Sequence, residues 1–112
     1  MKKNNSTGKV FSIKLKGRQR FVRLFGDSTK QGGLCSGFVA LKPGESIGEH
    51  RTDNKEEVII IIKGKAIIYY GKNKSVKAAQ NTFVYIPLDT VHNVKNPGSK
   101  ILQYVYVTAK VN

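Results

Sequence analysis

Hydrophobic and polar residues alternate over short stretches of this chain, and Gly, Pro and Asn separate one stretch from the next. Alternation with a period of two is typical of a β-strand with one buried face. Near the N-terminus, Val10–Lys16 alternates in part, and Arg20–Phe25 combines β-branched and aromatic residues before Gly26. The same criteria predict further strands at Leu34–Lys42, Glu57–Lys63, Lys65–Tyr70, Ser75–Ala79, Asn81–Ile86, Val91–Lys95 and Lys100–Thr108.

Short strands at this regular spacing predict an all-β fold, either a barrel or a sandwich. No window shows the helical hydrophobic period of about 3.6 residues, so we expect few helices. The 112 residues suit one domain, with a flexible polar segment at residues 1–8 and a single barrel domain at residues 9–112. The longest apolar run, Val58–Ile62, is far shorter than the roughly 20 residues of a membrane-spanning helix, so we expect no membrane partner.

The net charge of +13 is unevenly distributed, because five of the seven acidic residues lie between Glu45 and Glu57. A basic surface attracts anions such as nucleic acids, phosphorylated metabolites and acidic proteins, but a lysine-rich surface can also serve only to keep a small protein dissolved. Apart from charge, no pattern of interleaved aromatic and basic residues indicates nucleic-acid binding. A nucleic acid is therefore not the partner we expect.

Cys35 is the single cysteine, so the chain forms no internal disulfide and has no Cys-rich zinc pattern. It lies in an apolar run, and we expect it to pack as a small core residue. The N-terminal segment lacks the apolar stretch of a secretory signal. Together these features lead us to expect a cytoplasmic protein.

The residue types that carry chemistry point to one cluster. The chain has two histidines, His50 and His92, and each begins or lies in an expected strand near a turn. Glu57 opens a strand in which Ile59 and Ile61 share its face, so an inward Glu57 would place a carboxylate beside core residues. A buried carboxylate needs a partner, and either a metal ion or a basic side chain would supply one.

The spacing around Glu57 resembles the first motif of the cupin family. That motif is Gly, five residues, His-x-His, three or four residues, Glu, six residues and Gly. The matching residues are Gly44, His50, Glu57 and Gly64. Thr52 stands where the motif has its second histidine.

The segment around His92 resembles the second cupin motif, which is Gly, five residues, Pro-x-Gly, two residues, His, three residues and Asn. Pro87, His92 and Asn96 stand at the matching offsets. Asn81 and Asp89 replace the two glycines, and both are residue types that tolerate turn conformations.

The resemblance covers Leu34–Thr108 and implies a double-stranded β-helix, or jelly-roll barrel, with a metal ion held by the two motifs. Carried over by position, the metal ligands are His50, Glu57 and His92. Two imidazoles and one carboxylate suit a divalent transition metal such as Fe, Mn, Ni or Zn. Thr52 occupies the remaining ligand position, where a neutral hydroxyl is the poorer ligand.

Two alternatives to a metal centre stay open for this cluster. In the first, the site has lost its metal and Glu57 pairs with a protonated histidine or a lysine. In the second, His50 and His92 are ordinary hydrogen-bonded histidines of an apolar barrel. Further pocket candidates are Thr52, Tyr104 and Tyr106. Two tyrosines on one strand face also fit core packing with a solvated hydroxyl end.

The leading hypothesis for function is a small cupin that binds a divalent metal and a small anionic or oxygen-bearing metabolite. If the protein is an enzyme, the metal would act as a Lewis acid or an oxygen activator, and similar cupins catalyse dioxygenation, isomerisation or lyase reactions. The alternative is a metal-free module that binds a sugar or metabolite without catalysis. The third hypothesis is nucleic-acid association through the basic surface.

The resemblance also implies a homodimer. Cupins are commonly dimers, often through N-terminal strands. The strands expected at Lys9–Lys16 and Arg20–Phe25 lie outside the two motifs, and unpaired edge strands tend to be covered or paired.

Overall fold

The computed structural model describes residues 9–26 and 33–111, and these ranges contain nine strands and no helix. The strands are β1 (Phe21–Phe25), β2 (Leu34–Leu41), β3 (His50–Arg51), β4 (Lys55–Lys63), β5 (Lys65–Tyr70), β6 (Lys74–Ala79), β7 (Thr82–Ile86), β8 (Val91–Lys95) and β9 (Leu102–Lys110). The flexible segment expected at residues 1–8 lies outside the described residues. Within the described ranges, no helix is long and apolar enough to cross a membrane.

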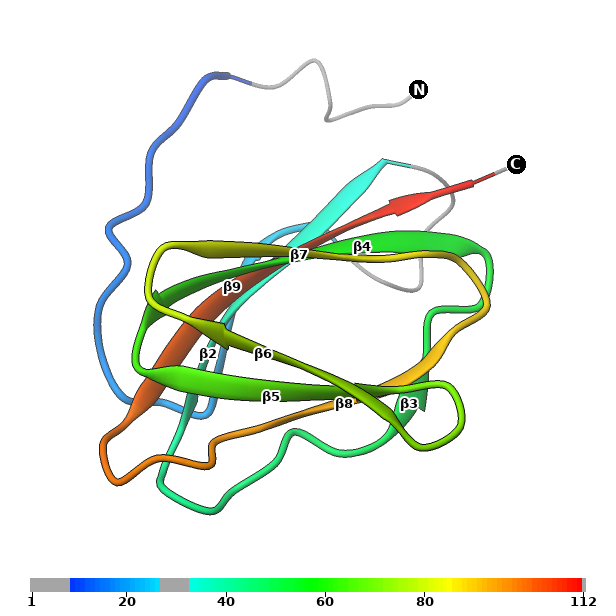
Figure 1. Ribbon diagram of the computed structural model, residues 1–112. Coiled ribbons are helices and arrows are strands. Elements are labelled where there is room, and N and C mark those ends of the chain that lie inside the picture. The colour runs from blue at the N-terminus through cyan, green and yellow to red at the C-terminus, as the bar shows by residue number, and fades with distance from the viewer. Residues whose placement is uncertain (1–8, 27–32, 112) are drawn as a thin grey trace.

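The strands form two antiparallel sheets that face each other across the interior (Figure 1). One sheet has five strands in the order β1-β2-β9-β4-β7, and the other has four in the order β3-β8-β5-β6. Apart from β1–β2 and β5–β6, strands that follow each other in the chain, such as β4 and β5, lie in different sheets, whereas β2 pairs with the distant β9 along its whole length. This topology is that of a jelly-roll barrel, so the predicted all-β fold is confirmed.

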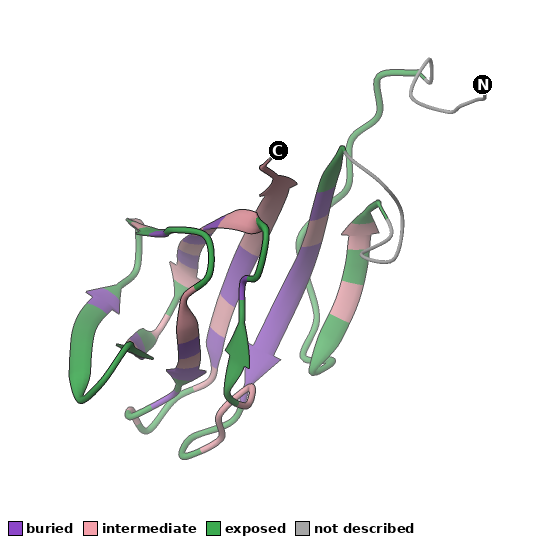
Figure 2. Cartoon of the chain, turned by 90° about the vertical axis from the view of Figure 1, so that its right-hand side faces the viewer, coloured by how far each residue is buried: buried purple, intermediate pink, exposed green. Residues whose placement is uncertain are grey.

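Side chains at alternate strand positions from both sheets build the core. Figure 2 shows buried positions interspersed along the strands, while the segment that leads into β1 is exposed. The core cluster consists of Val39, Leu41, Ile59, Ile61, Ala66, Ile68, Ala78, Ile86, Val94, Leu102 and Tyr104. On β4, Glu57 is buried on the same face as Ile59 and Ile61, as its alternation predicted. Cys35 is buried as well, which confirms its expected packing.

The segment before β1 differs from the expectation. The predicted strand at Val10–Lys16 is wrong, because residues 9–19 pair with neither sheet. The side chain of Gln103 donates a hydrogen bond to the carbonyl of Gly17 (2.8 Å), but the apolar side chains of this segment stay exposed. Alternation does not make a strand unless a neighbour satisfies the backbone groups. The homodimer expected through this segment stays a prediction.

Three tight turns depend on residues that accept a positive φ. Asn81 has φ 67° and Asp89 has φ 54°, which is the left-handed region that Gly, Asn and Asp adopt most readily. The prediction that these two residues suit turns is therefore confirmed. Gly64, between β4 and β5, has φ 93°, and a Cβ atom there would lie 2.6 Å from the carbonyl oxygen of Ile101.

Asn96 follows β8 and is fully buried. Its side-chain amide donates hydrogen bonds to the carbonyls of Leu41 (2.9 Å) and Lys100 (2.8 Å), and its side-chain oxygen accepts one from the backbone N–H of Gly98 (2.9 Å). The side chain thus joins the end of β2 to the loop between β8 and β9. This motif residue acts in the scaffold, away from the cluster of histidines.

We expect Asn96→Ala to destabilise the fold by about 2–3 kcal/mol, because it leaves the buried carbonyl of Leu41 without its side-chain donor and opens a small void. Urea denaturation followed by circular dichroism measures the change. Lys100→Ala is the matched control: it removes an exposed side chain and leaves the backbone carbonyl, so we expect a change within about 0.5 kcal/mol. Equal stability of the two variants would contradict the structural role of Asn96.

Candidate metal centre

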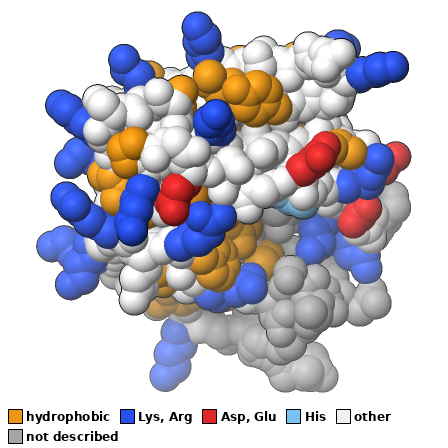
Figure 3. All heavy atoms as spheres, turned by 90° about the horizontal axis from the view of Figure 1, so that it is seen from below, with side chains coloured by type: hydrophobic (Ala, Val, Ile, Leu, Met, Phe, Trp, Pro, Cys, Tyr) orange, Lys and Arg blue, Asp and Glu red, His pale blue; other side chains and the backbone are white. Residues whose placement is uncertain are grey.

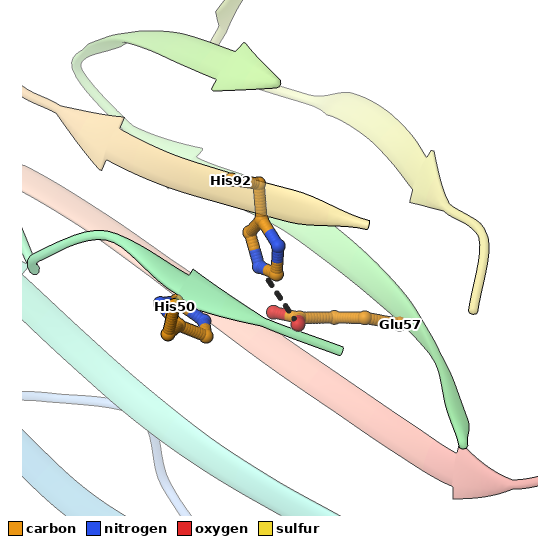
Figure 4. A group of neighbouring side chains, drawn as sticks. All are labelled: His50, Glu57 and His92. Atoms are coloured by element: carbon orange, nitrogen blue, oxygen red, sulfur yellow. Dashed lines mark hydrogen bonds and ion pairs between the residues drawn. The ribbon is translucent and has the colours of Figure 1, made fainter. Parts of the chain in front are cut away.

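Three strands bring His50, Glu57 and His92 together at one end of the barrel interior (Figure 4). His50 on β3 lies directly across from His92 on β8, with ring centroids 4.1 Å apart. Glu57 reaches them from β4 in the facing sheet. One ligand atom from each of the three lies within 4.8 Å of the others. The residues matched to ligand positions are therefore neighbours, and their binding of a metal stays a prediction.

His92 is held at both ring nitrogens. The residue is 1% exposed, its Nδ1 lies 3.1 Å from the carbonyl oxygen of Thr90, and its Nε2 lies 3.1 Å from Oε1 of Glu57. A carbonyl oxygen only accepts, so Nδ1 donates to Thr90, and Nε2 forms the hydrogen bond with the carboxyl group of Glu57. Burial lowers the pKa of His92, but the hydrogen bond and charge of Glu57 and the Thr90 carbonyl outweigh burial and raise the pKa above its usual value.

His50 lies at the rim of the site and is exposed. Its Nδ1 lies 3.0 Å from the carbonyl oxygen of Gly48, which makes Nδ1 the donor and leaves Nε2 as the ring nitrogen that can coordinate a metal. His92 uses Nδ1 in the same way, and in both cases the carbonyl belongs to the residue two positions earlier. Such backbone bonds orient imidazoles in metal sites.

A cavity of about 460 Å³ opens beside the cluster, within the size range of small-molecule sites. His50 and Glu57 line it, and so do the three pocket candidates Thr52, Tyr104 and Tyr106. Phe21, Val39, Ile47 and Val94 supply apolar wall. The view from below shows both acidic and basic side chains on the face where histidine atoms are visible (Figure 3). The site thus combines an apolar wall, polar groups and charged groups of both signs, among them Arg51, Asp53 and Lys55.

The profile of the cupin domain family (Cupin_2) matches residues 37–108, which include all three residues of the cluster. The chain belongs to the cupin family. Among curated proteins, a mannose-1-phosphate guanylyltransferase from Salmonella montevideo is 35% identical over 69 residues, which are 62% of this cupin and 14% of that relative. The match thus spans a small part of the relative's length.

Solved cupin structures share the fold. A Cupin 2 conserved barrel domain protein from Salinispora arenicola superposes with a TM-score of 0.70 at 24% identity, over 88% of this chain and 82% of that one. The cupin domain of Cnp3 from Schizosaccharomyces pombe superposes with a TM-score of 0.73 at 17% identity, over 88% of this chain and 69% of that one. At these identities the likeness establishes the fold of this cupin and nothing about its ligand.

Thr52 stands at the remaining ligand position, and its hydroxyl is already engaged. The residue is 6% exposed; its Oγ1 donates to the carbonyl of Pro87 (2.8 Å) and accepts from the N–H of Thr90 (2.8 Å). Its own N–H donates to the carbonyl of Thr90 (3.1 Å), the same oxygen that Nδ1 of His92 contacts. Thr52 therefore positions His92 through the Thr90 backbone rather than offering a free ligand atom.

The donor set fits a divalent metal. Two donors about 2.1 Å from one metal ion lie about 3.0–3.4 Å apart when adjacent in octahedral or tetrahedral geometry. The 3.1 Å between Nε2 of His92 and Oε1 of Glu57 matches this separation. Any wider separation within the set involves His50, which is exposed and can shift its ring. Two imidazoles and one carboxylate suit Fe, Mn, Ni or Zn and leave positions for a ligand.

Several cavity residues were missed at the level of sequence. Thr108 continues the alternation of Tyr104 and Tyr106 on β9, so extending that pattern by two residues would have found it. Phe21 could not be found locally, because it reaches the cavity only through the pairing of β1 with β2. Local alternation predicts the face of a residue, whereas the neighbouring strand decides which cavity that face meets.

We expect Thr52→Ala to lower the free energy of unfolding by about 1–3 kcal/mol, because the carbonyl of Pro87 and the N–H of Thr90 lose their partner. Thr52→Ser, which keeps the hydroxyl, should retain most of the stability. Metal content at saturation should be the same in both variants. Denaturation curves and elemental analysis give the two readouts. Loss of metal from Thr52→Ala at unchanged stability would instead identify the hydroxyl as a ligand.

We expect the metal-free protein to lose stability as the pH rises. A histidine whose folded-state pKa is raised stabilises the fold fully below its unfolded value of about 6.5, and this contribution is lost as the pH rises through the folded-state pKa. Urea denaturation of EDTA-treated protein from about pH 6 upward measures this. His92→Gln should remove this dependence of the free energy of unfolding on pH. If the variant loses the same amount of stability over the same pH range, another group is responsible. Because a metal must displace the Nε2 proton, metal affinity should rise over the same range.

Proposed function

We propose that this cupin binds one divalent transition metal ion through His50, Glu57 and His92 and holds a small anionic or oxygen-bearing metabolite beside it. The convergence of three donor atoms carries the proposal, because two of the three residues, His50 and Glu57, also line a metabolite-sized cavity. A carboxylate that is 7% exposed must be compensated, and a cation shared with two imidazoles compensates it.

The metal, when bound, would polarise an oxygen atom of the metabolite as a Lewis acid. The chain's own residues prepare the site. The carbonyls of Gly48 and Thr90 hold the two imidazoles so that Nε2 of each is the coordinating atom. Glu57 supplies the negative charge, and apolar wall residues such as Val39 and Val94 exclude water from that side of the cavity.

The basic surface and the curated relative support an anionic metabolite. A net charge of +13 attracts anions to the protein as a whole, and Arg51 and Lys55 bring positive charge to a cavity whose lining also contains Asp53 and Glu57. The relative is named for mannose 1-phosphate, a sugar phosphate, which is one candidate of this class.

A metal-free binding module is the second candidate, and the ion pair between Glu57 and His92 favours it. In the absence of a metal, the carboxylate is already paired with a histidine that is 1% exposed. Such a pair would keep the cavity stable for ligand binding without catalysis. The two candidates differ in whether ligand binding depends on a metal.

Elemental analysis of protein purified without chelator tests the metal. We expect about one equivalent of Fe, Mn, Ni or Zn in the wild type and less than about a tenth in Glu57→Gln and His92→Gln, since each variant removes one of three ligands. Glu56→Gln is the matched control, because its carboxylate points to the outer face, where it accepts a hydrogen bond from Tyr85. Its metal content should equal that of the wild type.

One outcome would reject the metal, and a second would favour the metal-free candidate. Less than about a tenth of an equivalent in the wild type, with no thermal shift on adding any of these metals, would reject binding. Equal stabilisation by a metabolite in EDTA-treated and metal-loaded protein would show that the ligand site works without a metal, as the second candidate requires.

A further inference from the structure

The hydroxyl of Tyr104 is buried without a partner. Tyr104 lines the cavity from β9 and is 2% exposed. Among the described residues, no side chain or backbone group forms a hydrogen bond with its hydroxyl, whereas Asn96, which is equally enclosed, has all its polar atoms bonded. Buried phenol hydroxyls normally find a partner, because leaving one unbonded costs free energy. A buried hydroxyl that has no hydrogen-bond partner in the protein and lines a cavity, like that of Tyr104, is a feature expected of a ligand site.

The guanidinium of Arg23, an exposed residue, lies beside the same cavity. Its NH1 lies 2.8 Å from Sγ of Cys35, and its Cζ lies 5.4 Å from the ring centroid of Phe21, and both of these residues line the cavity. The ring of Phe21 stacks on that of Tyr106 at 6.2 Å. Arg20 and Arg51 each pair with a carboxylate, but within the described part of the chain Arg23 has none.

The sheet fixes how far these groups lie from the metal cluster. Arg23 pairs with Gly37 on β2, Gly37 pairs with Tyr106 on β9, and Glu57 lies on β4, the next strand. Neighbouring strands are about 4.8 Å apart, and Glu57 lies two residues along β4 from Ile59, the partner of Tyr106, so Arg23 and Glu57 stand on the order of 16 Å apart within the sheet. The long side chains of Arg23 and Glu57 take up part of this distance, so a small molecule held at Arg23 points toward the cluster without having to contact it.

Gly37 makes the arrangement possible. A Cβ atom there would lie 2.6 Å from ring atoms of both Phe21 and Tyr106. The absence of a side chain therefore lets the two rings meet above the sheet, with Arg23 at the edge of the stack.

We propose that the cavity binds a small organic anion that carries a carboxylate or phosphate group. Arg23 and Tyr106 receive that group at the β1 side of the cavity. The hydroxyl of Tyr104 binds a second oxygen atom of the same molecule, whose far end points toward the His50, Glu57 and His92 cluster. The inference rests on the proposed binding of a metabolite in this cavity, but it does not rest on the metal.

The protonation of the two phenols is consistent with this role. Burial, followed by the charge of Glu57, raises the pKa of Tyr104 far above its usual value, and burial also raises the pKa of Tyr106. Both hydroxyls thus remain donors at neutral pH. A planar guanidinium with five N–H groups presents a fork that suits carboxylate and phosphate oxygens equally.

Isothermal titration calorimetry of the full chain, treated with EDTA, tests the inference with malate, mannose 1-phosphate and neutral mannose. We expect one of the two anions to bind and mannose to bind at least about tenfold more weakly, since it lacks the charge. Arg23→Gln should weaken the anion at least about tenfold, and Tyr104→Phe should weaken it about tenfold or somewhat less. Binding of malate would identify the ligand class as a carboxylic acid, and binding of mannose 1-phosphate would identify it as a sugar phosphate.

The matched controls are Arg18→Gln and Tyr69→Phe, which change an exposed arginine before β1 and an exposed tyrosine on β5. Both should bind the anion as the wild type does. Tyr104→Phe should unfold at the wild-type temperature or above it, because it removes an unbonded buried hydroxyl. If the Tyr104 hydroxyl only stabilised the fold, Tyr104→Phe would lower the melting temperature and leave the affinity for the anion unchanged.

Three results would overturn the inference: no binding of either anion at millimolar concentration, mannose binding as tightly as the anions, or an anion affinity unmoved by Arg23→Gln. Repeating the titrations on metal-loaded protein separates the two proposals. If the protein takes up no metal but still binds an anion in a way that depends on Arg23, the anion proposal holds and the metal proposal is wrong. If the protein takes up the metal but binds neither anion, the metal proposal holds and the anion proposal is wrong.

Discussion

The carboxylate of Glu57 lies on the same strand face as Ile59 and Ile61, where little water reaches it. A charge in such a place must be compensated, and the imidazole of His92 lies 3.1 Å away. Much of this end of the barrel serves that contact. The Thr90 carbonyl fixes the His92 ring, and Thr52 holds Thr90 through its hydroxyl and its backbone N–H. Replacing the proton between the two side chains by a metal ion would preserve the same compensation with more charge.

The motif residues of this cupin fall into two groups, one that shapes the fold and one that presents donor atoms. Asn96, Gly64 and the turn residues Asn81 and Asp89 shape loops and barrel ends, and none of them lines the cavity beside the cluster. His50, Glu57 and His92 present donor atoms. Thr52 belongs to the first group by its contacts, although its position in the motif belongs to the second. A family motif therefore locates a residue more dependably than it assigns its role, because one fold hosts many sites.

Two groups of residues beside the cavity, both in the five-stranded sheet, differ in how far the sequence predicts their position. The alternation of Tyr104 and Tyr106 predicted that they share a face, and both line the cavity. Nothing local connects Arg23 to them, since β1 joins the sheet through β2 and only the stacked order β1-β2-β9 brings its guanidinium near Tyr106. Charge and aromatic content were visible from composition, whereas their meeting above Gly37 required three paired strands.

The sequence by itself determined the strand content, the inward face of β4 and the two motif spacings, because these depend on residues close together in the chain. Only the tertiary structure decided which strands became neighbours, since backbone hydrogen bonds between distant segments select the partner. The pairing of β3 with β8 set His50 across from His92, and the facing sheet brought Glu57 to them. The alternating segment Val10–Lys16 shows the limit of local pattern: it has the periodicity of a strand, but neither sheet pairs with it.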